Sequence, residues 1–299
     1  MVTCQTLTIG TMRGVDLGKV GAWWSGTWRT KDEASVDAAA EMEGLGYTAL
    51  WSSGRFEPGL SPHFERLLSA TTHVAVASGI VSVWVAEPME LSRSIADLDA
   101  RYPGRFLLGL GASHAPAVEN YARPYAHIVD YLDGLDATGV VARDRRVLAA
   151  LGPRMLQLAA DRSAGAHPYF VPVEHTARAR QILGEGPLLA PEVTVVLERD
   201  PSTARALARS FTTTYLTLPN YTNNLRTFGF GDEDLVGGGS DRLVDAIVGW
   251  GDAEAIAGRV RAHHEAGADH VCVQVISSTG RESFPLAEYR ELAPALLDR

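Results

Sequence analysis

The sequence contains little cysteine, and this scarcity excludes a fold that depends on disulfide bonds. Only Cys4 and Cys272 occur among the 299 residues, and Cys272 lies in an apolar run where a buried thiol is expected. A compact chain of about 300 residues buries roughly 75% of its unfolded surface, so its core needs no covalent cross-link. We therefore expect a single α/β domain over residues 1–299.

A long hydrophobic run and an excess of basic charge are also missing. The longest apolar tract, VAVASGIVSVWVA at 74–86, is too short and too interrupted by Ser and Gly to span a bilayer. The formal net charge is −9, and no basic cluster is present that could neutralise phosphates. The N-terminus lacks the basic start and apolar stretch of a signal peptide. We expect a cytoplasmic protein that acts on a small molecule, with neither a nucleic acid nor a membrane as partner.

Several common catalytic patterns do not occur either. The nine histidines show no zinc-type spacing, since His114, His167 and His175 have no cysteine or carboxylate at ligand spacing. No G-x-S-x-G elbow is present, and no pair of carboxylates at strand ends indicates glycosidase chemistry. We therefore expect no metal site, and we expect the chemistry to come from an organic cofactor.

What the sequence does contain is a regular alternation of short apolar segments with amphipathic helices. Such alternation predicts a parallel sheet covered by helices. Eight strand segments can be counted, at residues 20–24, 47–51, 73–81, 104–111, 146–152, 165–170, 192–198 and 269–276. Eight units in about 300 residues favour a closed (β/α)₈ TIM barrel. An open Rossmann sheet is the alternative, but Gly109-Leu110-Gly111 lacks the third glycine of the dinucleotide fingerprint and lies in the fourth unit.

One segment interrupts the alternation before the last strand. Residues 217–243 are too many for a plain loop in a compact domain. Excursions of this length are usually lids, binding loops or disordered segments, and here Gly237–Gly239 could serve as a hinge. A partly helical insertion that packs on a neighbouring subunit is an equal alternative. We expect a homodimer.

A barrel places its active site at the carboxyl ends of its strands. In this sequence those ends are rich in Gly, Ala, Ser and Trp, and poor in acids. Small residues beside tryptophans suit a flat aromatic cofactor, with backbone amides on its polar edge. We expect Trp23, Trp24, Trp51 and Tyr221 to line the substrate pocket.

Three segments make the sequence similar to a known family. TTHVAVASGIVSVW (71–84), DLDARYPGRFLLGLGASH (97–114) and WGDAEAIAGRVRAHHEAGADHV (250–271) resemble the luciferase-like monooxygenase superfamily. The sequence is most similar to its branch of coenzyme F420-dependent oxidoreductases, and the resemblance covers residues 18–276. It implies a deazaflavin cofactor and hydride transfer to or from a small organic substrate. An FMN-dependent monooxygenase and a non-catalytic flavin- or deazaflavin-binding barrel remain as alternatives.

The resemblance also implies where the cofactor binds. A non-prolyl cis peptide at the end of the third strand falls at Gly79–Ile80, and small residues after the fourth and fifth strands approach the cofactor. The residues implied in cofactor binding are Ser78, Gly79, Ile80, Val81, Gly111, Ala112, Ser113, Ala149, Ala150, Gly152, Pro153, Arg154 and Gly165. The helix that begins at Pro153 offers free N–H groups to an anion, and Arg154 would add positive charge.

Two departures from the family concern the substrate and the proton transfer. Sugar-phosphate dehydrogenases of the family carry an Asp-His pair after the second strand, where this sequence has SSGR at 52–55. They carry a glutamate proton donor after the fourth strand, at the position of His114. Both departures disfavour glucose 6-phosphate as substrate. Because an ordinary histidine pKa near 6.5 allows proton transfer at neutral pH, His114 is the leading catalytic candidate, and His167 is the second.

Overall fold

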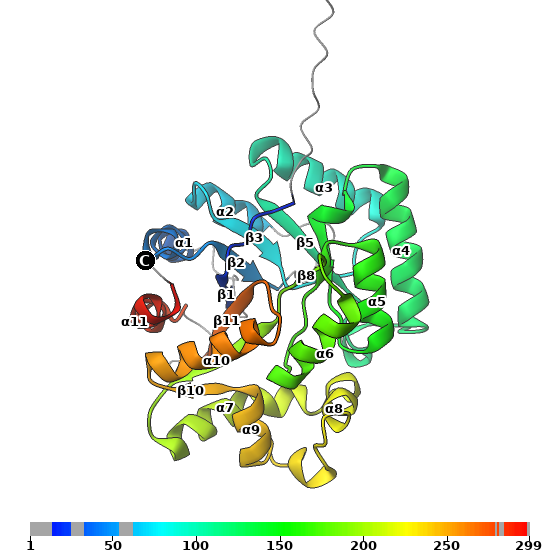
Figure 1. Ribbon diagram of the computed structural model, residues 1–299. Helices are drawn as coiled ribbons and strands as arrows, with labels where there is room; N and C mark the ends of the chain where they lie inside the picture. The colour runs from blue at the N-terminus through cyan, green and yellow to red at the C-terminus, as the bar shows by residue number, and fades with distance from the viewer. Residues whose placement is uncertain (1–13, 25–32, 54–61, 279, 281–283, 298–299) are drawn as a thin grey trace, which may run out of the picture.

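The computed structural model describes residues 14–24, 33–53, 62–278, 280 and 284–297 (Figure 1). Cys4 and residues 54–55 of the SSGR segment lie outside them. In these residues a curved parallel sheet occupies the centre, and helices surround it (Figure 1). None of the described helices is long and apolar enough to cross a membrane.

The sheet closes on itself, which confirms the predicted barrel. Its strands are β1 (Val20–Trp24), β2 (Ala49–Ser52), β3 (Ala75–Ser78), β4 (Val81–Ser82), β5 (Phe106–Gly111), β6 (Arg146–Leu148), β7 (Gly165–Ala166), β8 (Leu188–Leu189), β9 (Glu192–Leu197), β10 (Gly249–Gly251) and β11 (Val271–Val275). Their order is β10-β9-β11-β1-β2-β3-β5-β6-β7-β8, with β4 paired to β5. The short link from β8 to β9 joins both neighbours, because Ala190 N donates to Ala166 O (2.9 Å) and Cys272 N donates to Pro191 O (3.1 Å).

Helices form the outer layer. They are α1 (Glu33–Leu45), α2 (Pro62–Ala70), α3 (Pro88–Arg101), α4 (Pro124–Thr138), α5 (Pro153–Arg162), α6 (Val173–Leu183), α7 (Pro201–Tyr215), α8 (Pro219–Arg226), α9 (Asp241–Ile247), α10 (Ala253–Glu265) and α11 (Leu286–Leu296). Helix α3 shows why the sequence pattern predicted a helix. Proline occupies its first turn, and Leu91, Ile95 and Leu98 form the buried stripe. Helix α10 begins where the Asp252 side chain accepts from Ala255 N (2.9 Å).

Alternate strand residues divide the apolar core into two layers. Trp23, Trp51, Leu107 and Cys272 belong to the cluster inside the barrel. Their strand neighbours, such as Leu50, pack in a larger cluster with the surrounding helices. A residue's position along its strand therefore decides whether it faces the barrel axis or the helices.

The segment 217–243 is a folded helical insertion. It contains α8, a 3₁₀ turn at Asp232–Asp234 and the start of α9, and with α7 these helices gather on one side of the barrel (Figure 1). Tyr221, Leu225 and Leu243 contribute to a separate apolar core there. The helical alternative is thus confirmed, whereas contact with a neighbouring subunit stays a prediction.

Candidate active site

The chain leaves β3 through a bulge segment, residues 79–82, at the carboxyl end of the barrel. The peptide bond Gly79–Ile80 is cis, as the family resemblance implied. After it, Val81 and Ser82 form β4 and pair with Leu110 and Gly111 of β5. The bulge segment therefore runs beside the end of the fourth barrel strand.

Glycines in β5 allow this close approach. A Cβ on Gly109 would lie 1.9 Å from the carbonyl oxygen of Ser78, and the two residues exchange hydrogen bonds in which Gly109 N donates to Ser78 Oγ (2.8 Å) and Ser78 Oγ donates to Gly109 O (3.0 Å). A Cβ on Gly111 would lie 2.9 Å from Cδ1 of Ile80 and 3.0 Å from the Ala149 Cβ. The Ser78 hydroxyl is thus occupied in fixing the bulge segment.

On the barrel-axis side, Gly79 borders two buried ring nitrogens. A Cβ on Gly79 would lie 2.4 Å from Trp23 Nε1 and 3.1 Å from His167 Nε2. Among the residues that the structure describes, neither nitrogen has a hydrogen-bond partner. His167 Nδ1 donates to Ala190 O at 2.7 Å, which leaves Nε2 without a hydrogen on the neutral ring. Burial lowers the pKa of His167 to about 4, so it is an acceptor at neutral pH.

His114 lies at the mouth of the barrel, beyond the end of β5. It is half-buried, and its Nδ1 lies 3.2 Å from Asn220 Oδ1 of α8, while its ring is 5.4 Å from that of Tyr221. The insertion therefore reaches over the end of the fourth barrel strand. Burial lowers the pKa of His114, and the hydrogen bond with Asn220 opposes this shift. With Nδ1 donating to the carboxamide oxygen, Nε2 is the free acceptor.

The three tryptophans predicted to share one pocket face different environments. Trp23 points inward, with its ring 5.2 Å from that of Tyr169. Trp51, the partner of Trp23 on β2, belongs to the same inner cluster, where it stacks on His167 at 4.3 Å and its Nε1 donates to His270 Nε2 (3.0 Å). Trp24 points to the other face of β1, with its ring 4.2 Å from that of Phe284. Strand alternation thus separates Trp24 from the other two tryptophans.

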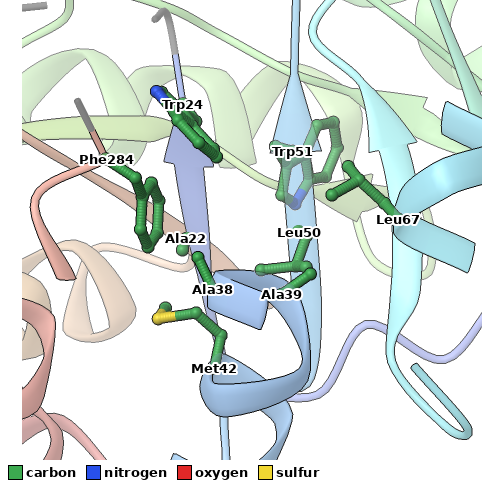
Figure 2. A pocket seen from close by; sticks show the side chains of 9 residues that line it. All are labelled: Ala22, Trp24, Ala38, Ala39, Met42, Leu50, Trp51, Leu67 and Phe284. Atoms are coloured by element: carbon green, nitrogen blue, oxygen red, sulfur yellow. The ribbon is translucent and has the colours of Figure 1, made fainter. Parts of the chain in front are cut away.

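Trp24 borders an apolar pocket between the sheet and helices α1 and α2 (Figure 2). The lining residues are Ala22, Trp24, Ala38, Ala39, Met42, Leu50, Trp51, Leu67 and Phe284. Because α1 and α2 pack on the outer face of the barrel, this pocket is distinct from the barrel mouth.

The remaining predicted cofactor residues fall into exposed and buried groups. Gly152, Pro153 and Arg154 are exposed at the start of α5, with the Arg154 guanidinium 4.2 Å from the centre of the Tyr125 ring. Ala112 and Ser113 are half-buried between β5 and His114. In contrast, Val81 and Ala150 are buried in the core shared with the helices. Gly165 is buried too, and a Cβ there would lie 1.9 Å from Leu188 O, so strand pairing accounts for this glycine.

Tyr169 and Glu192 lie near the mouth, although no motif pointed to them. The Tyr169 hydroxyl donates to Gln274 Oε1 (2.8 Å) and lies 2.9 Å from the Tyr215 hydroxyl. Glu192 is buried in β9, where it accepts from Thr194 Oγ1 (2.5 Å) and Phe170 N (3.3 Å). Burial raises the pKa of its carboxyl to about 7. The sequence signal for Glu192 was an acidic residue at the first position of an otherwise apolar strand.

Known proteins share parts of this sequence and its overall architecture. Residues 29–139 match the model of the luciferase-like monooxygenase family. The fold is shared with an F420-dependent secondary alcohol dehydrogenase in complex with an F420-acetone adduct, with a TM-score of 0.70 at 14% identity over 95% of this chain and 100% of that one. The comparison therefore shows a shared (β/α)₈ barrel fold. A search among curated proteins finds no significant match.

Other solved structures share the barrel fold, and their names give different cofactors. The coenzyme F420-dependent tetrahydromethanopterin reductase from Methanopyrus kandleri has a TM-score of 0.60 at 16% identity, over 94% of this chain and 98% of that one. The oxygenating constituent of 3,6-diketocamphane monooxygenase from Pseudomonas putida, in complex with FMN, has a TM-score of 0.62 at 15% identity, over 94% and 99%. At these identities the similarity establishes the fold.

The titratable side chains of the candidate site are few. Within the described residues no group of three or more His, Cys, Asp or Glu side chains could hold a metal ion. The titratable groups are two neutral imidazoles, His114 and His167, and the buried carboxyl of Glu192. Around them, Gly79 and Ile80 of the bulge segment and Ala112 and Ser113 after β5 are half-buried.

Proposed function

We propose that this barrel is a luciferase-like oxidoreductase that binds coenzyme F420 against the bulge segment and acts on a small organic substrate. The observation that supports it best is the close packing of the bulge segment on Gly109 and Gly111, which brings the half-buried Gly79 and Ile80 to the end of β5, just before His114. Side chains on the two glycines would push the bulge segment away from β5 and so disturb the surface that we assign to the flat ring. When bound, the deazaflavin would supply the hydride transfer.

The residues of the chain would supply binding and proton transfer. His114 Nε2 would take the proton of a substrate hydroxyl during oxidation, or return it during reduction, while Asn220 holds the ring in place. The start of α5 and Arg154 would bind the anionic part of the cofactor. Trp23 Nε1 and the Gln274 amide nitrogen, both buried without a partner in the described structure, fit a site that offers donors to a polar ligand.

Two of the structural neighbours are named as F420-dependent, and a third is bound to FMN. The competing functions are therefore an FMN-dependent monooxygenase and a flavin- or deazaflavin-binding barrel without catalysis. Titration of the purified protein into F420 separates the two cofactors, and substrate-dependent oxidation or reduction of the bound F420 separates an enzyme from a barrel without catalysis. We expect quenching of deazaflavin fluorescence with micromolar affinity and no retention of FMN through gel filtration. Retention of FMN without a response to F420 would contradict the proposal.

A further inference from the structure

A closed chain of contacts surrounds the barrel mouth. On one side it follows aromatic side chains, with ring-centre distances of 5.4 Å from His114 to Tyr221, 6.4 Å from Tyr221 to Tyr169 and 5.2 Å from Tyr169 to Trp23. On the other side Trp23 lies against Gly79 of the bulge segment. The next residue, Ile80, lies against Gly111 of β5, which precedes His114 by three residues. We call this set the mouth ring; its members are Gly79, Ile80, Gly111, His114, Tyr169, Tyr221 and Trp23.

Solvent reaches part of the mouth ring. Gly79, Ile80, His114 and Tyr169 are half-buried, and each follows the carboxyl end of a strand that is itself buried, whereas Gly111, Trp23 and Tyr221 are buried. The ring thus has one wall of backbone and small side chains, and an opposite wall of aromatic side chains. A ligand between the walls would contact the bulge segment, or a cofactor on it, with one face and the aromatic side chains with the other.

The chemistry of the mouth ring is neutral. It contains no Lys, Arg, Asp or Glu, and the lowered pKa of His114 keeps that side chain uncharged at neutral pH. An anionic ligand would therefore lose its hydration without gaining a positively charged partner among these residues. The nearby Glu192 carboxyl, which adds to burial in raising the pKa of Tyr169 and Tyr221, would repel it when ionised. The aromatic rings are tilted at 49–53° to one another, which offers both faces and edges to a flat aromatic ligand.

The hydrogen-bonding groups of the mouth ring determine how a ligand would be oriented. Asn220 occupies His114 Nδ1, so Nε2 accepts from the ligand, and hydroxyl groups are suitable donors. At the other end of the aromatic wall the Trp23 N–H has no acceptor in the described structure. We propose that the mouth ring binds an uncharged, flat aromatic compound whose hydroxyl group donates to His114 Nε2. This inference rests on the proposed function, since the compound would be the substrate of that oxidoreductase.

The test compares three matched ligands by calorimetric titration of the F420-loaded protein: 2-naphthalenemethanol, its carboxylate analogue 2-naphthoate, and its saturated analogue decahydro-2-naphthalenemethanol. We expect the neutral aromatic alcohol to bind at least about tenfold more tightly than the other two. Equal or tighter binding of the carboxylate or of the saturated alcohol would overturn the inference, as would a lack of binding by all three.

Variants locate the binding site. Tyr169→Leu, which removes the ring, should weaken binding of 2-naphthalenemethanol about tenfold, whereas Tyr169→Phe should stay within about threefold. Tyr102→Leu is the matched control, because Tyr102 precedes β5 at the opposite end of the barrel. Equal losses in Tyr169→Leu and Tyr102→Leu would contradict the assignment. If Tyr169→Leu does not fold, the ligand series on the unmodified protein decides.

Separate titrations distinguish the two proposals. If F420 fails to bind but the unloaded protein still prefers the aromatic alcohol, the proposed function is wrong and the inference stands. If F420 binds and the ligand preference is missing, only the inference fails.

Discussion

His114 and His167 show how the environment of a histidine decides what it can do. Both imidazoles are neutral at neutral pH, and both present Nε2 as an acceptor. His167, however, is 2% exposed and packs on Gly79 and Trp51, whereas His114 is half-buried at the mouth. The structure therefore favours His114 as the residue that meets a substrate, and both catalytic roles remain predictions.

Removing the His114 imidazole tests its role directly. We expect His114→Ala to lower kcat by about 10²–10⁴-fold, because general acid–base catalysis contributes that much. The affinity for F420 should change by no more than a fewfold, as measured by fluorescence titration. His127→Ala is a control, since His127 lies in α4 with its Nε2 3.0 Å from Val83 O. Unchanged turnover in His114→Ala would exclude the assignment.

The pH profile should follow the same residue. A base must be neutral, and burial lowers the pKa of His114 below its ordinary value of 6.5. Oxidation of a hydroxyl substrate should therefore hold steady from pH 8 to 6.5 and decline only at lower pH. Asn220→Ala removes the hydrogen bond that raises this pKa, so the decline should move to still lower pH. Measurement of kcat across pH 5–8 for both proteins tests this prediction. A decline at higher pH in Asn220→Ala than in the unmodified protein would contradict it.

At the scale of elements, the sequence predicted the strands and helices well because their patterns are local. Each of the eight predicted segments overlaps a strand of the barrel, and the cis bond at Gly79–Ile80 was assigned correctly. Helix α2 and strands β8 and β10 were not predicted. Contacts between distant elements were not predictable: the outward placement of Trp24 follows from strand alternation, but its ring neighbour Phe284 does not, and the helical core of the insertion depends on residues of α7 and α9. The role of Gly165 likewise became clear only from its neighbour strand.

The contact of the bulge segment with β5 can be tested with one methyl group. Gly109→Ala would place a Cβ 1.9 Å from Ser78 O, so we expect a loss of about 1–3 kcal/mol in the free energy of unfolding. Gly44→Ala is the matched control, because a Cβ there meets no atom within 4 Å and alanine favours helix α1. Urea denaturation compares the two variants. Equal stability of both would mean that the contact is looser than described.

At the scale of the whole molecule, buried histidines couple stability to pH. Burial lowers the pKa to about 4 for His167, His175 and His270, and to about 3 for His263. The unfolded chain therefore binds more protons than the folded one between about pH 6.5 and 4, and each histidine costs about 1.4 kcal/mol per pH unit there. Glu192 acts in the opposite sense, because its pKa is raised to about 7.

The sum of these effects predicts acid sensitivity. With four depressed histidines against one raised carboxyl, we expect the free energy of unfolding to fall by several kcal/mol between pH 7 and 5. Urea denaturation at the two pH values measures it, and Glu192→Gln should enlarge the difference. Constant stability over this range would show that the histidines are not buried as a group. The expected homodimer and cytoplasmic location stay predictions at this scale.

A crystal structure of the protein grown with coenzyme F420 tests the central claim most directly. The account predicts that the deazaflavin ring lies against residues 79–82 and 111–113, with its anionic part near the start of α5 and His114 beside the ring. A deazaflavin bound elsewhere, or a barrel mouth that excludes it while FMN occupies the same surface, would contradict the account.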